Sequence, residues 1–158
     1  YYLSFENKTY QCILGRAGLI NFKYKIEGDG ATPQGKWSIN DVWHRPDKIS
    51  KFICRLPIKN IIENDGWCDD PKSPDYNKHI KLPYKYKHEK LFRNDSLYDI
   101  LITLGYNESP TIKGKGSAIF IHCREKNKNF TEGCIGLWKS EIIEILENLD
   151  VNCHLIIK

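Results

Sequence analysis

The chain has 158 residues, which suits a single compact domain, residues 1–158, with its own hydrophobic core. Hydrophobic residues make up 41% of the sequence and charged residues 28%, and the longest apolar runs are only strand-sized, so no membrane-spanning segment is expected. The net charge of +4 is a modest excess that suits an anionic polymer such as a cell wall and is a weak signal for nucleic-acid binding.

Short strands separated by turns containing Gly and Pro dominate the predicted elements of the first half. Strands are predicted at Tyr10–Leu14, Phe22–Ile26 and Trp37–Trp43, with a dense turn at residues 28–35. The segment Ile62–Lys81 is polar and contains Asp-Gly, Asp-Pro and Ser-Pro pairs. It predicts a long irregular loop, and such loops inside compact domains are usually functional or mobile.

The second half predicts buried strands at Tyr98–Leu104 and Ser117–Cys123 and a closing strand at Cys153–Ile157. The clearest helix is predicted at Ser140–Leu149, because its Ile and Leu residues recur at helical spacing. Ser140 is expected to be the N-cap of this helix. Together these elements describe a mainly β fold with one or two helices.

Two residues with the chemistry of a base and a nucleophile lie in one segment. His122 ends a predicted buried strand, and Cys134 follows Gly133 at the end of the next loop. An imidazole can take the proton of a nearby thiol and hold the resulting ion pair, while glycine leaves room for a substrate carbonyl. The acceptor that orients the second imidazole nitrogen is either a backbone carbonyl or a side chain. On spacing alone, a strand-end histidine and a buried structural cysteine are the favoured explanation of these residues, because buried free cysteines are common.

The six cysteines are widely spaced and form no CxxC pair, which argues against zinc-ribbon and thioredoxin-like sites but leaves disulfides open. A metal site built from His122, Cys123 and Cys134 is disfavoured, because adjacent strand residues point to opposite faces. Thiolate chemistry needs no metal, nucleotide or flavin, so no cofactor is expected.

The segment GSAIFIHCREKNKNFTEGCIGL, residues 116–137, resembles the catalytic stretch of the L,D-transpeptidase (YkuD-type) family. The family's strand-end histidine and its Ser/Thr, Gly and Cys fall here on His122, Thr131, Gly133 and Cys134. Three further blocks are similar to those of one branch of the family and occur in the same order: residues 27–35, 67–77 and 91–99. Four ordered matches over nearly the whole chain favour the catalytic interpretation of Cys134 and His122.

The resemblance implies an L,D-transpeptidase-like β-sandwich or barrel that acts on peptidoglycan stem peptides. Cys134 would attack the carbonyl of a diamino acid, usually meso-diaminopimelate, release D-alanine and form a thioester. An amine of a neighbouring stem peptide would resolve the thioester in an L,D-transpeptidase, and water would do so in an L,D-carboxypeptidase. A catalytically silent wall-binding module and a hydrolase of another amide are the alternatives. The presence of both Cys134 and His122 favours an enzyme.

The resemblance is incomplete after the cysteine, where residues 135–138 lack the Asn and Arg found in many family members. Arginines match carboxylates in bidentate geometry, so three of them are candidates for binding the substrate carboxylate, with structural ion pairs as the alternative: Arg124, Arg93 and Arg45. The other candidate substrate-binding residues are Thr131, Trp67, Tyr98 and Ser117.

The implied substrate suggests a periplasmic or cell-wall location, a role in peptidoglycan biosynthesis and cell shape, and carbapenem acylation of Cys134. The sequence contains no methionine, so Tyr1 is not expected to be the natural start, which is compatible with a removed leader. We expect a monomer whose partners are peptidoglycan stem peptides, without nucleic-acid binding or stable membrane insertion.

Overall fold

A seven-stranded sheet forms the centre of the fold in the computed structural model, which describes residues 1–158. Its strands, in chain order, are β3 (Leu19–Asn21), β4 (Thr32–His44), β5 (Ile58–Asn60), β9 (Ile100–Leu104), β10 (Phe120–Cys123), β11 (Ile135–Leu137) and β12 (His154–Ile157). The sheet runs in the order β11-β10-β9-β4-β12, and β3 and β5 also pair with β4. Neighbours are antiparallel from β4 to β10, whereas β10 and β11 are parallel.

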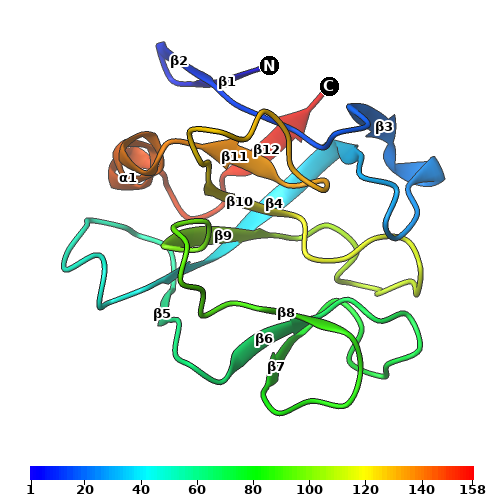
Figure 1. Ribbon diagram of the computed structural model, residues 1–158. Helices are drawn as coiled ribbons and strands as arrows, with labels where there is room; N and C mark the ends of the chain where they lie inside the picture. Colours follow the sequence, from blue (N-terminus) through cyan, green and yellow to red (C-terminus); the bar gives the residue numbers. More distant parts are fainter.

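A three-stranded sheet and an N-terminal hairpin lie at opposite ends of the molecule, with both termini on the hairpin side (Figure 1). These and the remaining elements are β1 (Tyr2–Phe5), β2 (Lys8–Gln11), the 3₁₀-helix η1 (Phe22–Tyr24), β6 (Asp65–Cys68), β7 (His79–Lys81), β8 (His88–Lys90) and α1 (Lys139–Asn148). With ten residues, α1 is far too short to span a membrane.

The mainly β fold class predicted from the sequence is confirmed, with a single α-helix. The predicted strand Trp37–Trp43 lies inside the longer β4, and the predicted strands at Tyr98–Leu104 and Ser117–Cys123 contain β9 and β10. The predicted helix is α1, displaced by one residue toward the N-terminus.

Two predicted features near the chain's turns are wrong. Phe22–Ile26 is not a strand, because the side chain of Asn21 accepts a hydrogen bond from Lys23 N at 3.0 Å and starts the 3₁₀ turn η1. Ser140 is not the N-cap of α1. The helix begins one residue earlier, after the extended Trp138, whose N–H donates to the Glu141 carboxylate at 2.8 Å.

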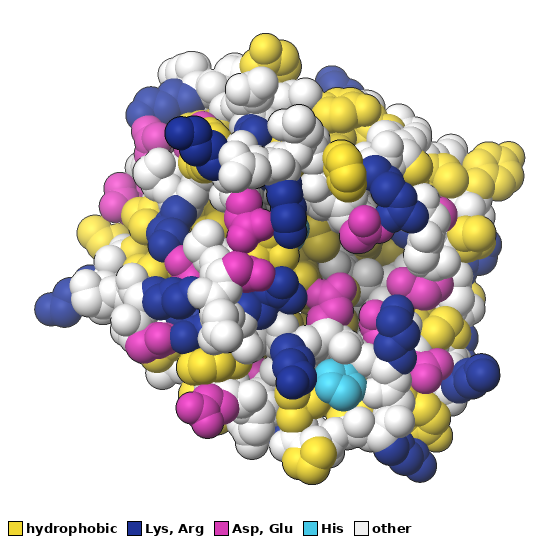
Figure 2. All heavy atoms as spheres, viewed as in Figure 1, with side chains coloured by type: hydrophobic (Ala, Val, Ile, Leu, Met, Phe, Trp, Pro, Cys, Tyr) yellow, Lys and Arg dark blue, Asp and Glu magenta, His cyan; other side chains and the backbone are white.

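The predicted long loop at Ile62–Lys81 contains two strands, β6 and β7, of the second sheet. Its polarity hides them, because the charged residue Asp65 is buried inside the sheet, where it pairs with Lys81 and forms a hydrogen bond with His79. A lysine-rich run at residues 78–90, whose charge is typical of a solvated surface segment, also contains two strands, β7 and β8. Lys, Arg and acidic side chains are interspersed over the face that Figure 2 shows, so no patch of one sign covers it.

Strands β9, β10 and β11 of the central sheet are buried on both faces, and the alternation of side chains along β10 assigns residues to each face. Ile121 and Cys123 join the larger core, which also contains the inner face of α1. Phe120 joins a second core between the two sheets, with Trp67 of β6 and Tyr98 just before β9. The side chain of His122 therefore lies on the face between the two sheets.

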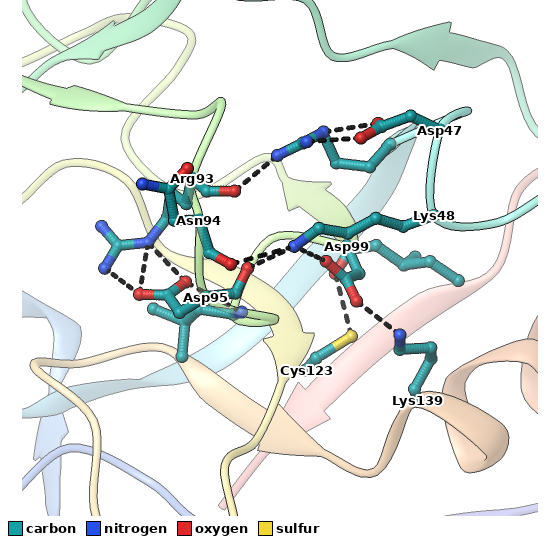
Figure 3. Close-up of polar contacts among 11 residues, drawn as sticks. Asp47, Lys48, Arg93, Asn94, Asp95, Asp99, Cys123 and Lys139 are labelled. Carbon is teal, nitrogen blue, oxygen red and sulfur yellow. Dashed lines mark hydrogen bonds and ion pairs between the residues drawn. The ribbon is translucent and has the colours of Figure 1, made fainter.

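An ion network around Asp99 holds the segment that joins β8 to β9. Asp99 is 2% exposed, and its carboxylate lies between two lysines (Figure 3). Oδ1 lies 2.9 Å from Lys48 Nζ, an ion pair without hydrogen-bond geometry, and Oδ2 accepts from Lys139 at the start of α1. Lys48 Nζ also donates to the carbonyl of Asp95 at 2.6 Å. The network thus connects the segment before β9 to α1 and to the loop after β4.

Replacing Asp99 by Asn should lower the free energy of unfolding by about 2 kcal/mol, because two ammonium groups lose their carboxylate at a buried position. We expect a smaller loss than the roughly 3–5 kcal/mol typical of fully buried pairs, since the Lys139 side chain is 40% exposed. Urea unfolding followed by tryptophan fluorescence measures the change. Asp150→Asn is the matched control, because it breaks the exposed pair with Arg55 and should have little effect. Equal losses in both variants would contradict the role of Asp99.

Candidate active site

The pairing of β10 with β11 puts Cys134 and His122 on the same face of the central sheet. His122 is directly opposite Gly136 in this parallel pair, and Cys134 lies two residues before Gly136. Side chains two residues apart share a face, so Cys134 and His122 are diagonal neighbours, with about 8 Å between their Cα atoms by strand geometry. Both side chains line an open pocket of about 640 Å³.

The thiol of Cys134 is held by the backbone of the segment that leads into β10. Sγ donates to the carbonyl of Ala118 at 3.0 Å and accepts from Phe120 N at 3.4 Å. Burial raises the pKa of the Cys134 thiol to about 12, and the nearby Glu89 carboxyl adds to the increase. Cys134 therefore carries its proton at neutral pH, and its acceptor in this structure is Ala118 rather than His122.

The imidazole of His122 has a fixed tautomer. Nδ1 lies 2.8 Å from the carbonyl of Cys123, which can only accept, so the proton is on Nδ1 and Nε2 is the basic nitrogen. This backbone carbonyl is the orienting acceptor that the sequence left open. Burial lowers the pKa of His122 to about 4. The resting pair is thus a thiol and a neutral imidazole, and not the ion pair that the sequence analysis envisaged.

Thr131 shapes the turn that presents Cys134. Its Oγ1 donates to the carbonyl of Cys134 at 2.7 Å and accepts from Gly133 N at 3.1 Å. The backbone of Thr131 is fixed in turn by hydrogen bonds with Leu14 and Arg16. The N–H of Cys134 has no acceptor within the protein, so it is free to donate to an oxyanion that forms beside the sulfur.

Gly133 is required at this turn for two reasons. Its φ of +138° is rarely adopted by residues with a side chain, and a Cβ there would lie 3.0 Å from the carbonyl oxygen of Ala31. Ala31 is positioned by the Asp29 carboxylate, which accepts from Ala31 N at 2.9 Å and pairs with Lys25. The glycine-rich segment at residues 27–35 therefore supports the turn before Cys134.

The pocket brings together most of the residues singled out in the sequence, but not all of them. Besides Cys134 and His122, four of the candidate substrate-binding residues line it: Arg93, Arg124, Tyr98 and Thr131. Three others do not. Trp67 packs edge-on against Phe120 and donates to Asn77, Ser117 donates to Glu27, and Arg45 pairs with Asp47.

The three candidate arginines differ in how free they are to bind an anion. Arg45 pairs with Asp47 and stacks on Phe92, with 3.5 Å between Cζ and the ring centroid. Arg93 pairs with Asp95 at 2.6 Å. Arg124 forms no ion pair and lies over the indole of Trp138, with its buried Nε unpartnered. Arg124 is therefore the pocket arginine available to a carboxylate.

Glu89 is a pocket residue that the sequence analysis missed. It is the central residue of β8, and it accepts a hydrogen bond from the hydroxyl of Tyr98, whose ring packs edge-on against His122 with 5.6 Å between centroids. Its short strand lies in a run of lysines that reads as a solvated surface segment. The signal in the sequence that could have identified Glu89 is its position as a single acidic residue between two basic ones, His88 and Lys90.

The family model "YkuD: L,D-transpeptidase catalytic domain" matches residues 4–157 of the chain. The searches of curated proteins and of solved structures each returned no match. The matched region spans nearly the whole chain and includes both Cys134 and His122. The protein therefore belongs to the YkuD family of L,D-transpeptidase catalytic domains, a family of cysteine-nucleophile enzymes.

Proposed function

We propose that the protein is a peptidoglycan L,D-transpeptidase in which Cys134 forms a thioester with a stem tetrapeptide, releases D-alanine and passes the acyl group to an amine. The observation that carries the proposal is the position of Cys134 and His122 on one face of the sheet, in one pocket. The family match supports it independently.

In the first half-reaction, rotation of the Cys134 side chain would exchange the Ala118 carbonyl for Nε2 of His122 as the acceptor of the thiol proton. Sulfur attacks the carbonyl carbon as the proton moves to Nε2, so neither charge has to form alone in the buried site. The free N–H of Cys134 stabilises the oxyanion, and the imidazolium then protonates the departing amine of D-alanine.

Arg124 is proposed to bind the terminal carboxylate of the donor peptide. It forms no ion pair with an acid, its Cζ lies over the Trp138 ring at 4.6 Å from the ring centroid, and it follows β10 two residues after His122. A planar guanidinium in this position can receive a carboxylate with two parallel hydrogen bonds.

The substrate class places the proposed activity in the periplasm or cell wall, where stem peptides are found. We also propose that carbapenems acylate Cys134, because the same thiol is the nucleophile. Resolution of the thioester by water instead of an amine would make the enzyme an L,D-carboxypeptidase, and the products of the reaction distinguish these outcomes.

The function is tested by incubating the protein with defined tetrapeptide muropeptides and separating the products. The wild-type protein should release D-alanine, and Cys134→Ala should release none, because the thioester cannot form. His122→Gln should slow release by about 10²- to 10⁴-fold through loss of the base. A protein that binds muropeptides without releasing D-alanine would be a silent wall-binding module, and unchanged release by Cys134→Ala would refute the mechanism.

The pH dependence of D-alanine release should reflect the buried imidazole. The neutral form of His122 is the base, and its pKa is lowered from 6.5 to about 4, so kcat/KM should fall only as the pH approaches about 4. Circular dichroism over the same range checks that the fold persists.

Alkylation of the free enzyme at Cys134 by iodoacetamide should be slow at neutral pH, because the thiol pKa is about 12. For D-alanine release, a fall in kcat/KM centred near pH 6.5 would contradict the burial of His122.

Arg124→Ala should raise KM for the tetrapeptide by about 10- to 100-fold, the loss expected for a charge-assisted hydrogen bond. Arg55→Ala is the control, since Arg55 pairs with Asp150 at the exposed surface outside the pocket. A donor whose terminal carboxylate is amidated sharpens the test, because it should bind the wild type and Arg124→Ala equally weakly. A full Arg124 effect on the amidated donor would show that Arg124 binds another group.

A further inference from the structure

Glu89, which belongs to the second sheet, lines the same pocket as the reactive sulfur. Glu89 lies opposite Trp67 in the pairing of β8 with β6, and it lines the same pocket as Cys134 and His122. Its charge is close enough to raise the pKa of the thiol. The thiol therefore shares its pocket with two titratable groups from different elements, the imidazole of β10 and the carboxyl of β8.

Glu89 is held in place but is not neutralised. Tyr98 donates to Oε2, whereas Oε1 has no hydrogen bond and the carboxyl forms no ion pair. The cations around it have other partners: Lys87 pairs with Asp69 at 2.9 Å and Arg93 with Asp95 at 2.6 Å. A carboxyl that is held at one oxygen and has no partner at the other can accept a hydrogen bond from a cation that enters the pocket.

The surroundings of Glu89 also make it a stronger base than a surface glutamate. The pKa of Glu89 is raised, chiefly by burial and also by the nearby carboxylates of Asp69 and Glu27. The hydrogen bond from Tyr98 and the charge of Arg93 act in the opposite direction. Lys87 and Cys134 are the other titratable groups near it. The negative potential favours an ammonium, and the increased basicity favours proton transfer from it.

We propose that Glu89 binds the ammonium of the acyl acceptor and takes a proton from it, and so directs the acyl group to an amine in preference to water. The inference rests on the proposed function, because it concerns the fate of the thioester on Cys134. It assigns the second substrate as a primary amine that enters from the side of β8.

The proposed step is balanced in atoms and charge. The acceptor R–NH₃⁺ gives one proton to the Glu89 carboxylate, and the freed nitrogen pair attacks the thioester carbonyl. The C–S bond breaks with its electron pair going to sulfur, while a second N–H proton passes through His122 to restore the Cys134 thiol. The new amide keeps the third proton, and Glu89 returns its own to solvent. His122, with its lowered pKa, is the weaker base for an ammonium.

The test measures two quantities with the full chain and a tetrapeptide muropeptide that serves as donor and acceptor: the rate of D-alanine release, and the ratio of cross-linked dimer to hydrolysed tripeptide. Glu89→Gln should lower the ratio of dimer to tripeptide by at least about 10-fold. Near pH 10, where much of the acceptor amine is free, the variant should regain dimer formation. Glu89→Asp, which keeps a carboxylate, should retain part of the ratio, and Tyr98→Phe should lower it modestly.

Glu108→Gln is the matched control. Glu108 is also a partly buried carboxyl that accepts a hydrogen bond, from Asn40, but it lies outside the pocket, so both quantities should be unchanged. The proposal is overturned if Glu89→Gln leaves the ratio of dimer to tripeptide unchanged. A wild-type protein that releases D-alanine but forms only tripeptide would overturn this inference and make the enzyme an L,D-carboxypeptidase, whereas one that releases no D-alanine would overturn the thioester chemistry of the proposed function as well.

Discussion

The parallel register of β10 with β11 is the constraint on which the site depends. A shift of one residue in this pairing would turn Cys134 toward the core that contains Ile121, on the opposite face from His122. The register is fixed from both ends by backbone hydrogen bonds, because Gly136 exchanges two with Ile13 and Arg124 N donates to Leu137 at 2.7 Å. The edge strand β11 is therefore held on both sides, although it has only three residues.

Burial of the site determines the protonation of Cys134 and His122. Loss of water raises the pKa of Cys134 and lowers that of His122, so each group is neutral before substrate arrives. A protonated thiol is a poor nucleophile toward oxidants and alkylating agents. In such a site, charge develops only when a substrate carbonyl can accept it and the N–H of Cys134 can stabilise it, so reactivity is coupled to binding.

The sequence predicted the features that follow from regular patterns, and it failed where local polar contacts decide the structure. The β-branched and aromatic residues of β10 and the helical spacing in α1 were sufficient to find both elements, and the motif around Cys134 indicated the family. The strands of the second sheet were missed because Asp65 is buried there with His79 and Lys81, against the rule that charged residues are exposed. Arg124 could not be distinguished from Arg45 either, since ion-pair partners are not readable from sequence.

The segment that was hardest to predict also makes the pocket asymmetric. The second sheet contributes Glu89, while the loop after β10 contributes Arg124, so acidic and basic groups approach Cys134 from different elements. In the proposed reaction an anionic donor and a cationic acceptor meet at one sulfur, and groups of opposite sign on separate walls would keep the two substrates from competing for one position. The ion network of Asp99 then has a consequence beyond stability, because it holds the segment with Arg93 and Tyr98 that joins these two walls.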